Sequence, residues 1–511
     1  MKRWIRILAG AGVAVASVLA VAFATRSLWL PERYAINVPV AHLMGRPPAV
    51  APEAVVESLG LPDGFTVTKF ASGLDNARFL RVTERGDLVV SQPREGRVTL
   101  LRADENRDGG SDGNVTLVDG LDRPHGLALR DGYLYVAEMT AVGRIAFDAA
   151  ARKATGVFER VITGLPSGGN HWTRTIGFGP DGLLYLSVGS SCNVCVEEDP
   201  RRAAISRYDP ATWRGSIYAS GLRNAVGLAW RRIETGDGGR HELFATDNGR
   251  DLLGNDYPPC ELNLVVEGGF YGWPFANGNR VSDPDFGRGR EREVASSLPP
   301  VHNFPAHNAP LGITFLEAAG TPDGYQGAAL VALHGSWNRT TKDGYKVVSL
   351  HWDAQGRITQ RDFLTGFLRN EQVIGRPVDV TQGLDGAIYV SDDFGGVVFK
   401  VTRGSTSANI SAATTASMPA RASEPEPTVD PAAAARGRAV WIENQCDMCH
   451  DPALVGKDPD TPIKVLEKLG ARYDLARMIT YLKAPQPPMP LFELTDEQRR
   501  DLSAYVLSRF P

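Results

Sequence analysis

The chain has 511 residues, a formal net charge of −4 and 22% charged residues. It is too long for one ordinary domain, and its weak negative charge, with no long basic segment, argues against nucleic-acid binding. The sequence contains 54 Gly, 34 Pro and only 5 Cys. That composition is typical of a turn-rich β protein and excludes a disulfide-dense scaffold.

Residues 1–24 have the pattern of an export segment. An apolar stretch over residues 7–24 follows three cations, Lys2, Arg3 and Arg6. The stretch ends in Ala22-Phe23-Ala24, which fits a cleavage site, but it is also long enough to span a bilayer. We therefore expect either a cleaved signal peptide or a retained membrane anchor, and both place the remaining chain in a bacterial periplasm. Residues 25–60 contain several Pro and predict a lead-in segment without a core of its own.

Residues 61–403 contain six imperfect copies of one strand–turn–strand unit. The copies begin at Gly73, Gly120, Gly164, Gly221, Gly312 and Gly366. The early copies are spaced by about 40–50 residues, which is a period typical of propeller blades. A pair of packed sheets would be equally rich in turns but would not repeat the same unit. We therefore predict an all-β six-bladed β-propeller over residues 61–403.

The remaining residues predict a linker and a second, small all-α domain. Residues 404–433 are rich in Pro, Ser, Thr and Ala and are typical of a flexible linker. Residues 434–511 show helical periodicity, and Thr495 is a suitable cap for a last helix over residues 496–509.

The C-terminal segment contains the motif Cys446-Asp447-Met448-Cys449-His450. Two thiols at this spacing can bind the vinyl groups of a haem, and the adjacent His can bind its iron. A disulfide or half of a zinc site would not explain the His, so we predict a cytochrome c domain with covalent haem c. Met489, in a Pro-rich loop, is the favoured second iron ligand, and Met478, within a helical pattern, is the alternative.

Polar and cationic residues recur where the innermost strand begins in five of the six repeats. They are Arg78, Arg123, His125, His171, Arg174, Arg223, Asn224 and Arg376. Since the starts of the innermost strands surround one end of a propeller channel, we expect a cationic funnel suited to a polyanion. The acidic segment 247–251, followed by Asp256, Glu261 and Asn263, offers hard oxygen ligands for Ca²⁺.

Several stretches resemble the pyrroloquinoline quinone (PQQ)-dependent glucose/sorbosone dehydrogenase family of six-bladed propellers. They are Gly169-Asn170-His171, Gly221-Leu222-Arg223-Asn224, Asn248-Gly249-Arg250-Asp251, residues 268–274 and residues 375–380. The resemblance covers about residues 61–403. The attached C-terminal haem motif resembles fused pyranose and sorbosone dehydrogenases.

The resemblance implies roles for the matching residues. His171 matches the general base, Arg223 and Asn224 match residues beside the quinone, and Arg376 matches an Arg that binds a carboxylate. Arg123 and His125 are further expected cofactor contacts at the channel mouth.

The main-chain carbonyls of Gly249 and Arg250 match the Ca²⁺ ligands of the family. The chain departs from the glucose enzyme at two positions. Val378 replaces a second Arg, and Arg250 replaces a Pro. We therefore expect differences in quinone contacts and in substrate choice.

These features predict a periplasmic quinohaemoprotein that oxidises a sugar (an aldose, pyranose or sorbosone-like compound), alcohol or aldehyde at PQQ and passes electrons to its own haem c. The expected partners are the substrate and a downstream electron acceptor, either a cytochrome or a respiratory quinone, with the N-terminus as a candidate membrane attachment. Two alternatives are a Ca²⁺-dependent lactone hydrolase and a non-catalytic propeller that presents the cytochrome to a redox partner. A hydrolase would need a carboxylate cage in the channel, where this chain has His and Arg.

Three further features fall outside this scheme. Cys192 and Cys195 form a second C-x-x-C without a following His and predict a local disulfide. Cys260 has no evident partner and is expected in a loop. The segment 104–109 begins like a Ca²⁺ loop, but its twelfth position is Val115, so we favour a plain hairpin tip.

Overall fold

The computed structural model describes residues 50–234, 239–318, 320–322, 324–404, 431–443, 475–483 and 494–510, together with residues 466, 469 and 473. The chain divides into two compact units, Met1–Ser411 and Ala412–Pro511. The predicted export segment 1–24, most of the predicted linker and the haem motif lie outside the described residues. Among the described residues, no helix is both long and apolar enough to cross a membrane.

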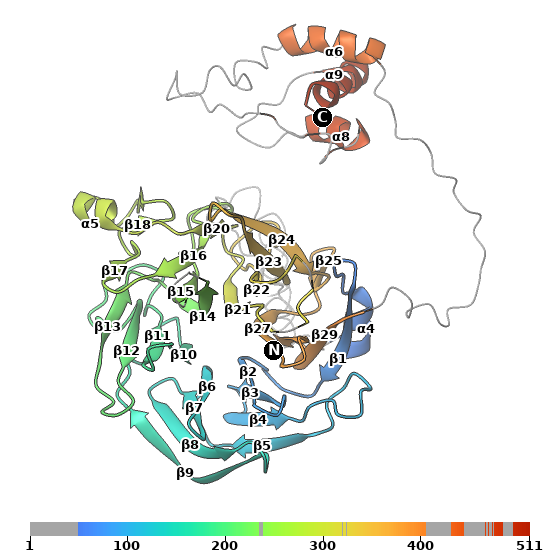
Figure 1. Ribbon diagram of the computed structural model, residues 1–511. Coiled ribbons are helices and arrows are strands. Elements are labelled where there is room, and N and C mark those ends of the chain that lie inside the picture. The colour runs from blue at the N-terminus through green and yellow to red at the C-terminus, as the bar shows by residue number, and fades with distance from the viewer. Residues whose placement is uncertain are drawn as a thin grey trace, which may run out of the picture. The chain divides into compact units, whose positions relative to one another are not determined.

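Six antiparallel sheets surround a central channel in the N-terminal unit, as Figure 1 shows, so the predicted six-bladed β-propeller is confirmed. Blade 1 contains β2 (Leu80–Val82), β3 (Leu88–Gln92), β4 (Arg97–Leu101) and β5 (Asn114–Val118). Blade 2 contains β6 (Leu127–Arg130), β7 (Tyr133–Ala137), β8 (Val142–Asp148) and β9 (Lys153–Ile162). Blade 3 contains β10 (Arg174–Phe178), β11 (Leu184–Val188), β12 (Ala204–Tyr208) and β13 (Gly215–Ser220), with the short parallel strand β17 (Gly269–Phe270) at its edge.

The other three blades follow the same order. Blade 4 contains β14 (Ala225–Ile233), β15 (Arg240–Asp247), β16 (Cys260–Val265) and β20 (His302–Phe304). Blade 5 contains β21 (Pro310–Phe315), β22 (Ala329–Leu333), β23 (Lys346–Trp352) and β24 (Ile358–Leu364). Blade 6 contains β27 (Pro377–Gln382), β28 (Ile388–Asp392), β29 (Val397–Arg403) and β1 (Phe65–Ala71).

Blade 6 closes the ring, because its outer strand comes from the start of the chain. β1 pairs antiparallel with β29, and Phe65 lies opposite Arg403. The short helix α4 (Pro52–Ser58) precedes β1, and Val55 packs among core residues of blades 5 and 6. The end of the lead-in segment therefore packs against the core of the propeller and not around a core of its own.

Small elements lie between the main strands. They are the hairpin of β18 (Ala276–Asn277) and β19 (Val281–Ser282), the helix α5 (Glu291–Ser296), and the hairpin of β25 (Leu368–Arg369) and β26 (Gln372–Val373). The β18–β19 hairpin follows the segment that carries the candidate Ca²⁺ ligands.

The burial of each strand follows its position in the blade. The second strands β3, β11 and β28 are buried along their whole length, because neighbouring blades cover both faces of each sheet. The outer strand β9 is mostly exposed. Hydroxyl groups on the second strands link one blade to the next, since Ser187 Oγ donates to the Ala225 carbonyl at 2.5 Å and Thr246 Oγ1 donates to the Leu311 carbonyl at 2.6 Å.

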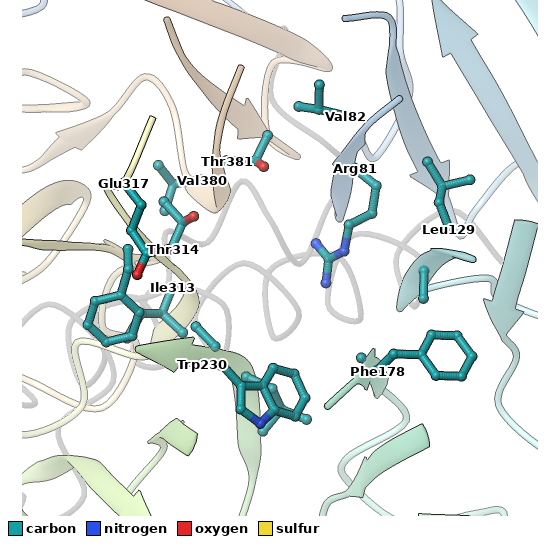
Figure 2. A pocket seen from close by; sticks show the side chains of 15 residues that line it. Arg81, Val82, Leu129, Phe178, Trp230, Ile313, Thr314, Glu317, Val380 and Thr381 are labelled. Atoms are coloured by element: carbon teal, nitrogen blue, oxygen red, sulfur yellow. The ribbon is translucent and has the colours of Figure 1, made fainter. Parts of the chain in front are cut away.

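A cavity of about 430 Å³ lies in the channel where the innermost strands end (Figure 2). Arg81 from β2, Phe178 from β10 and Trp230 from β14 contribute to its lining. The candidate site residues lie where the same strands begin, so this cavity belongs to the opposite end of the channel.

The C-terminal unit is helical and confirms the predicted small all-α domain. Its described helices are α6 (Pro431–Glu443), α8 (Leu475–Lys483) and α9 (Asp496–Arg509), and α6 begins inside the segment predicted as linker. Thr495 and Gln498 form a capping box at the start of α9, as the sequence predicts. Trp441, Met478 and Leu502 belong to one apolar core.

Gly437 allows α6 and α9 to approach closely. A Cβ atom at this position would lie 1.9 Å from the main-chain carbonyl oxygen of Asp501. Arg436 pairs with both carboxylate oxygens of Asp501, at 2.7 and 2.8 Å, and fixes the same crossing.

Candidate active site

His171 lies in the loop before β10 and is held by the segment after β11. Its Nδ1 atom lies 2.9 Å from both the carbonyl oxygen and the Oγ atom of Ser190. A carbonyl can only accept, and Ser190 Oγ uses its own hydrogen toward the Cys192 carbonyl at 2.8 Å. The proton of the neutral ring is therefore on Nδ1, which leaves Nε2 with a lone pair that can accept a proton.

The surroundings of His171 keep its imidazole neutral. Burial and the positive charge of Arg223 lower the pKa of His171 to about 3. Asp251 acts in the opposite direction by favouring the charged form. The ring is therefore an unprotonated acceptor over the whole neutral pH range, with a carboxylate near enough to stabilise the imidazolium that proton uptake would form.

Arg223 is the most completely bonded side chain of the site. It is buried, with 4% of its surface exposed. Nε donates to the Asn193 carbonyl and Nη2 to Asn193 Oδ1, both at 2.9 Å. Nη1 donates to the carbonyls of Asn248 and Gly249, at 3.2 and 2.9 Å. Nη2 also forms an ion pair with Asp251 at 3.0 Å.

Asp251 connects this cluster to His307. The Nδ1 atom of His307 lies 3.5 Å from Asp251 Oδ1, and its Nε2 atom lies 2.7 Å from the Gly254 carbonyl. Burial opposes ionisation of Asp251, but His307 and Arg223 together hold its pKa below the usual value. Asp251 is therefore an anion beside the guanidinium of Arg223.

Asn224 offers an open acceptor beside His171. Its Oδ1 atom is buried and has no hydrogen-bond partner. Gly189 makes room for the two side chains, because a Cβ atom there would lie 2.4 Å from Asn224 Oδ1 and 2.7 Å from His171 Cβ. A buried acceptor without a partner is costly, so a bound donor would stabilise this arrangement.

Gly249 and Arg250 follow β15, as the Ca²⁺ assignment requires. A Cβ atom at Gly249 would lie 2.5 Å from the Pro259 carbonyl, so only Gly fits there. The Arg250 side chain turns away and binds both carboxylate oxygens of Asp283 at 2.8 Å and Asp285 at 2.9 Å. Only the main chain of Arg250 is thus available to a ligand at the mouth.

Arg376 directly precedes β27 of blade 6 and bonds to the segment after β22 in blade 5. Its Nε and Nη2 atoms donate to the carbonyls of His334 and Gly335, both at 3.2 Å. The Asp393 carboxylate accepts from Arg78 at 2.8 Å and lies 2.9 Å from His334 Nε2. His334 and Arg78 hold the pKa of Asp393 far below its usual range although burial raises it.

The cationic funnel differs from the prediction, because several of its members are bonded inside the protein. His125 is fully buried, accepts from Arg78 Nη2 at 3.5 Å and donates to the Arg174 carbonyl at 3.0 Å. Arg174 is 1% exposed and donates to three main-chain carbonyls. Arg123 is exposed, and its guanidinium lies over the Trp172 ring. His125 and Arg174 are therefore bonded inside the protein around the mouth and do not line it.

The three cysteines of the propeller and the loop that begins at Asp104 were not assigned to the site. Cys192 and Cys195 form a disulfide, as predicted. Cys260 is buried at the start of β16, so its expected place in a loop was wrong. Lys400 Nζ lies 2.9 Å from Asp104 Oδ2, so an ammonium group neutralises the loop that resembles a Ca²⁺ site between β4 and β5.

The predicted haem ligands Cys446, Cys449, His450 and Met489 lie outside the described residues. Met478 is 4% exposed and packs in the apolar core of the C-terminal unit. The choice of Met489 over Met478 as the second iron ligand stays a prediction.

Sequence reasoning missed Ser190 and Asn193, considered the Asp251 carboxylate only as an oxygen ligand for Ca²⁺, and gave no role to the side chain of His334. A signal existed for the first three, because they directly follow β11 and β15 at the end of the propeller where His171 and Arg223 lie. No local pattern distinguishes His334, since its partner Asp393 belongs to another blade.

The fold and this site define a class: a six-bladed β-propeller with a polar histidine–arginine site at one end of its channel, followed by a cytochrome c domain. Residues 434–509 match the cytochrome c family. The chain belongs to the TrAA12-like family, whose model matches residues 59–260 and 288–404. The resemblance to PQQ-dependent propellers fused to a cytochrome is therefore confirmed.

Two relatives show the extent of the similarity. An uncharacterised protein of Borreliella burgdorferi is 28% identical over 367 residues, which cover 69% of this chain and 93% of that protein. The pyrroloquinoline quinone-dependent pyranose dehydrogenase of Coprinopsis cinerea is 27% identical over 413 residues, 68% of this chain and 54% of that protein. The chain thus spans about half the length of that dehydrogenase.

Solved structures show the same fold. The holo form of the PQQ domain of pyranose dehydrogenase from Coprinopsis cinerea aligns with a TM-score of 0.57 and 24% identity, over 70% of this chain and 98% of that one. The calcium structure of a Trichoderma reesei enzyme of carbohydrate-active family AA12 aligns with a TM-score of 0.57 and 22% identity, over 70% and 99% of the two chains.

Proposed function

We propose that this chain is a PQQ-dependent sugar dehydrogenase that passes electrons from the propeller to its own haem c. The observation that carries the proposal is the neutral imidazole of His171, with Nε2 as acceptor, next to the buried guanidinium of Arg223. A relative named as a pyranose dehydrogenase, and membership of the TrAA12-like family, support a sugar as the substrate. The cytochrome c domain supports an intramolecular electron acceptor.

The residues at the mouth fit a quinone that carries carboxylates. Asn224 Oδ1 is a buried acceptor without a partner, and Arg223 and Arg376 supply positive charge from two different blades. The residues also fit Ca²⁺, which prefers oxygen ligands. The carbonyls of Asn248 and Gly249 and the Asp251 carboxylate already converge on one cation, the guanidinium of Arg223. The main-chain carbonyls of Gly249 and Arg250 would hold the Ca²⁺.

The residues of the chain can carry the proton steps of an alcohol oxidation. When bound, PQQ supplies an acceptor for the hydride that leaves the C–H carbon of the substrate. His171 Nε2 accepts the hydroxyl proton, while Ser190 keeps the ring in the required tautomer and orientation. Asp251 stabilises the resulting imidazolium, and the fixed positive charge of Arg223 stabilises developing negative charge. The haem would accept the electrons one at a time.

The proposal includes an exported location. Haem c and the Cys192–Cys195 disulfide both suit an oxidising compartment outside the cytoplasm, and the pattern of residues 1–24 suits export. A bacterial periplasm provides cytochromes and membrane quinones as downstream acceptors, and the N-terminal segment would supply the membrane attachment if it is retained.

The haem spectrum tests the proposal directly. The full chain is loaded with PQQ and Ca²⁺, and aldoses, pyranoses, sugar alcohols and aldehydes are added one at a time while haem absorbance is followed. We expect at least one sugar to reduce the haem only when PQQ is present. If every compound leaves the haem oxidised while dithionite still reduces it, the dehydrogenase proposal fails, and a propeller that presents a cytochrome to a partner remains.

A further inference from the structure

The disulfide loop of blade 3 contacts residues of the candidate active site. Cys192 and Cys195 close a ring around Asn193 and Val194, with Cα atoms 6.2 Å apart. Ser190 Oγ, which contacts His171, donates to the Cys192 carbonyl at 2.8 Å. The ring is therefore connected to the candidate base through Ser190, by two hydrogen bonds.

Asn193 accepts hydrogen bonds from Arg223 with two different oxygen atoms. Its main-chain carbonyl accepts from Nε and its Oδ1 atom accepts from Nη2, both at 2.9 Å. Two contacts to adjacent nitrogens fix both the position and the plane of a guanidinium, which one contact cannot do. Trp273 Nε1 also donates to the same main-chain carbonyl at 3.4 Å.

The same side chain joins blade 3 to blade 4. Asn193 Oδ1 accepts from the Asp251 main-chain N–H at 2.8 Å, and Asn193 Nδ2 donates to the Asp251 carbonyl at 3.0 Å. Asp251 and Gly249 belong to the same segment, and both accept hydrogen bonds from Arg223. By bonding to Asp251, Asn193 therefore fixes this segment relative to the disulfide loop. All these contacts of Asn193 depend on the backbone position of one residue inside the ring.

The surroundings of the disulfide disfavour thiol exchange, so it is a structural crosslink and not a redox switch. Glu197 Oε1 lies 4.0 Å from Cys192 Sγ and 3.7 Å from Cys195 Sγ. Ser191 holds this carboxylate through its N–H and its hydroxyl, at 2.6 and 2.8 Å. A carboxylate at this place repels an attacking thiolate and disfavours the thiolate that would leave, so it protects the bond from thiol exchange.

We propose that Asn193 is the positioning residue for Arg223, and that the Cys192–Cys195 disulfide holds Asn193 in place. The consequence for quinone binding rests on the proposed function, whereas the clamp itself does not. Arg has a long, flexible side chain, and a clamp that orders it in advance lowers the entropy cost of ligand binding. Loss of either oxygen contact, or of the ring, would loosen the guanidinium on its blade 3 side and leave its contacts to Asn248, Gly249 and Asp251.

The clamp can be tested without any cofactor. Phenylglyoxal modifies accessible guanidinium groups, and peptide mapping of the modified full-length protein reports the rate at Arg223 alone. We expect Asn193→Ala and the double variant Cys192→Ser/Cys195→Ser to raise this rate by about ten-fold, because each weakens charge-assisted hydrogen bonds. Asn193→Asp keeps an oxygen acceptor and should retain the protection. Asn106→Ala, at an exposed Asn in the β4–β5 loop, is the matched control and should change nothing.

A second measurement separates the clamp from the proposed function. Apo protein is titrated with PQQ in the presence of Ca²⁺, and we expect about ten-fold weaker binding in the two releasing variants. If the rate at Arg223 is unchanged in both variants, the positioning role of Asn193 is overturned. If the rate rises while PQQ affinity stays constant, the clamp is supported and the assignment of Arg223 to the quinone fails. If Asn193→Ala does not fold, the double variant alone decides, since its side chains are nearly isosteric with the native ones.

Discussion

The Nδ1 atom of His171 donates to the carbonyl oxygen of Ser190 at 2.9 Å, and this single contact determines which ring nitrogen can accept a proton. The hydroxyl of Ser190 continues to the Cys192 carbonyl, and the disulfide loop continues through Asn193 to Arg223. The candidate base and the candidate electrostatic group thus belong to one hydrogen-bonded network that starts after β11. Their relative position is therefore set by the main chain of blade 3 and not by the two side chains alone.

Replacing His171 by Ala should lower the rate of haem reduction by substrate by about 10²–10⁴-fold, which is the usual contribution of a general base. Haem content should stay the same, because His171 lies in the propeller and the haem motif lies in the C-terminal segment. Stopped-flow absorbance at the haem bands measures the rate. Unchanged turnover in this variant would reject His171 as the base.

The pH dependence of the reaction should reflect the buried state of His171. Its pKa is lowered to about 3, so the imidazole remains an acceptor as the pH falls through 6.5 and is lost only when the pH approaches 3. We expect kcat/KM for haem reduction to show no acid limb between pH 5 and 7. An acid limb near pH 6.5 would show that the ring is solvated in solution.

The lowered pKa of His171 also makes the stability of the fold depend on pH. The unfolded chain binds a proton at His171 near pH 6.5, whereas the folded chain does so only near pH 3. Between these values the unfolded state binds more protons, so this group destabilises the fold progressively on acidification. Circular dichroism at each pH is therefore the control that separates loss of activity from loss of fold.

The second haem ligand can be assigned by comparing two Met residues. Met489→Ala should abolish the iron–sulfur charge-transfer band of the oxidised haem, because the thioether ligand is removed. Met478→Leu should keep the band and cost less than about 1.5 kcal/mol of stability, since Met478 is a core residue and Leu conserves its volume. Loss of the band in the Met478 variant alone would exchange the two assignments.

The crossing of α6 and α9 should not tolerate a larger residue than Gly437. A Cβ atom there would lie 1.9 Å from the Asp501 carbonyl oxygen and 2.8 Å from Tyr505 Cβ, so the helices would have to separate. We expect Gly437→Ala to lower the free energy of unfolding of the C-terminal unit by about 2 kcal/mol, despite the better helix propensity of Ala. Thermal melting of the full chain, followed at the haem absorbance, measures the change. Arg438→Ala, at an exposed position of the same helix, should melt like the wild type.

The amino-acid sequence by itself predicts the features that depend on short-range spacing. The six repeats of a strand–turn–strand unit correspond to six blades, the cap at Thr495 is present, and the second C-x-x-C forms a local disulfide. Each of these follows from residues within one turn or one blade, where the chain itself brings the partners together. The haem motif is of the same kind, although its residues lie outside the described part of the structure.

Only the tertiary structure decided which charges face the channel mouth. Arg174 and His125 occupy the expected repeat position, yet the carbonyls of neighbouring loops and the guanidinium of Arg78 take up their polar atoms. Lys400, near the C-terminal end of the propeller sequence, neutralises the loop that begins at Asp104. β1, from the N-terminal end, pairs with β29 and completes blade 6. These partners are distant in the chain, and closure of the ring brings them together. A residue's type and spacing therefore reveal that it can bind a ligand, whereas the neighbouring blades determine whether its polar atoms are left available to do so.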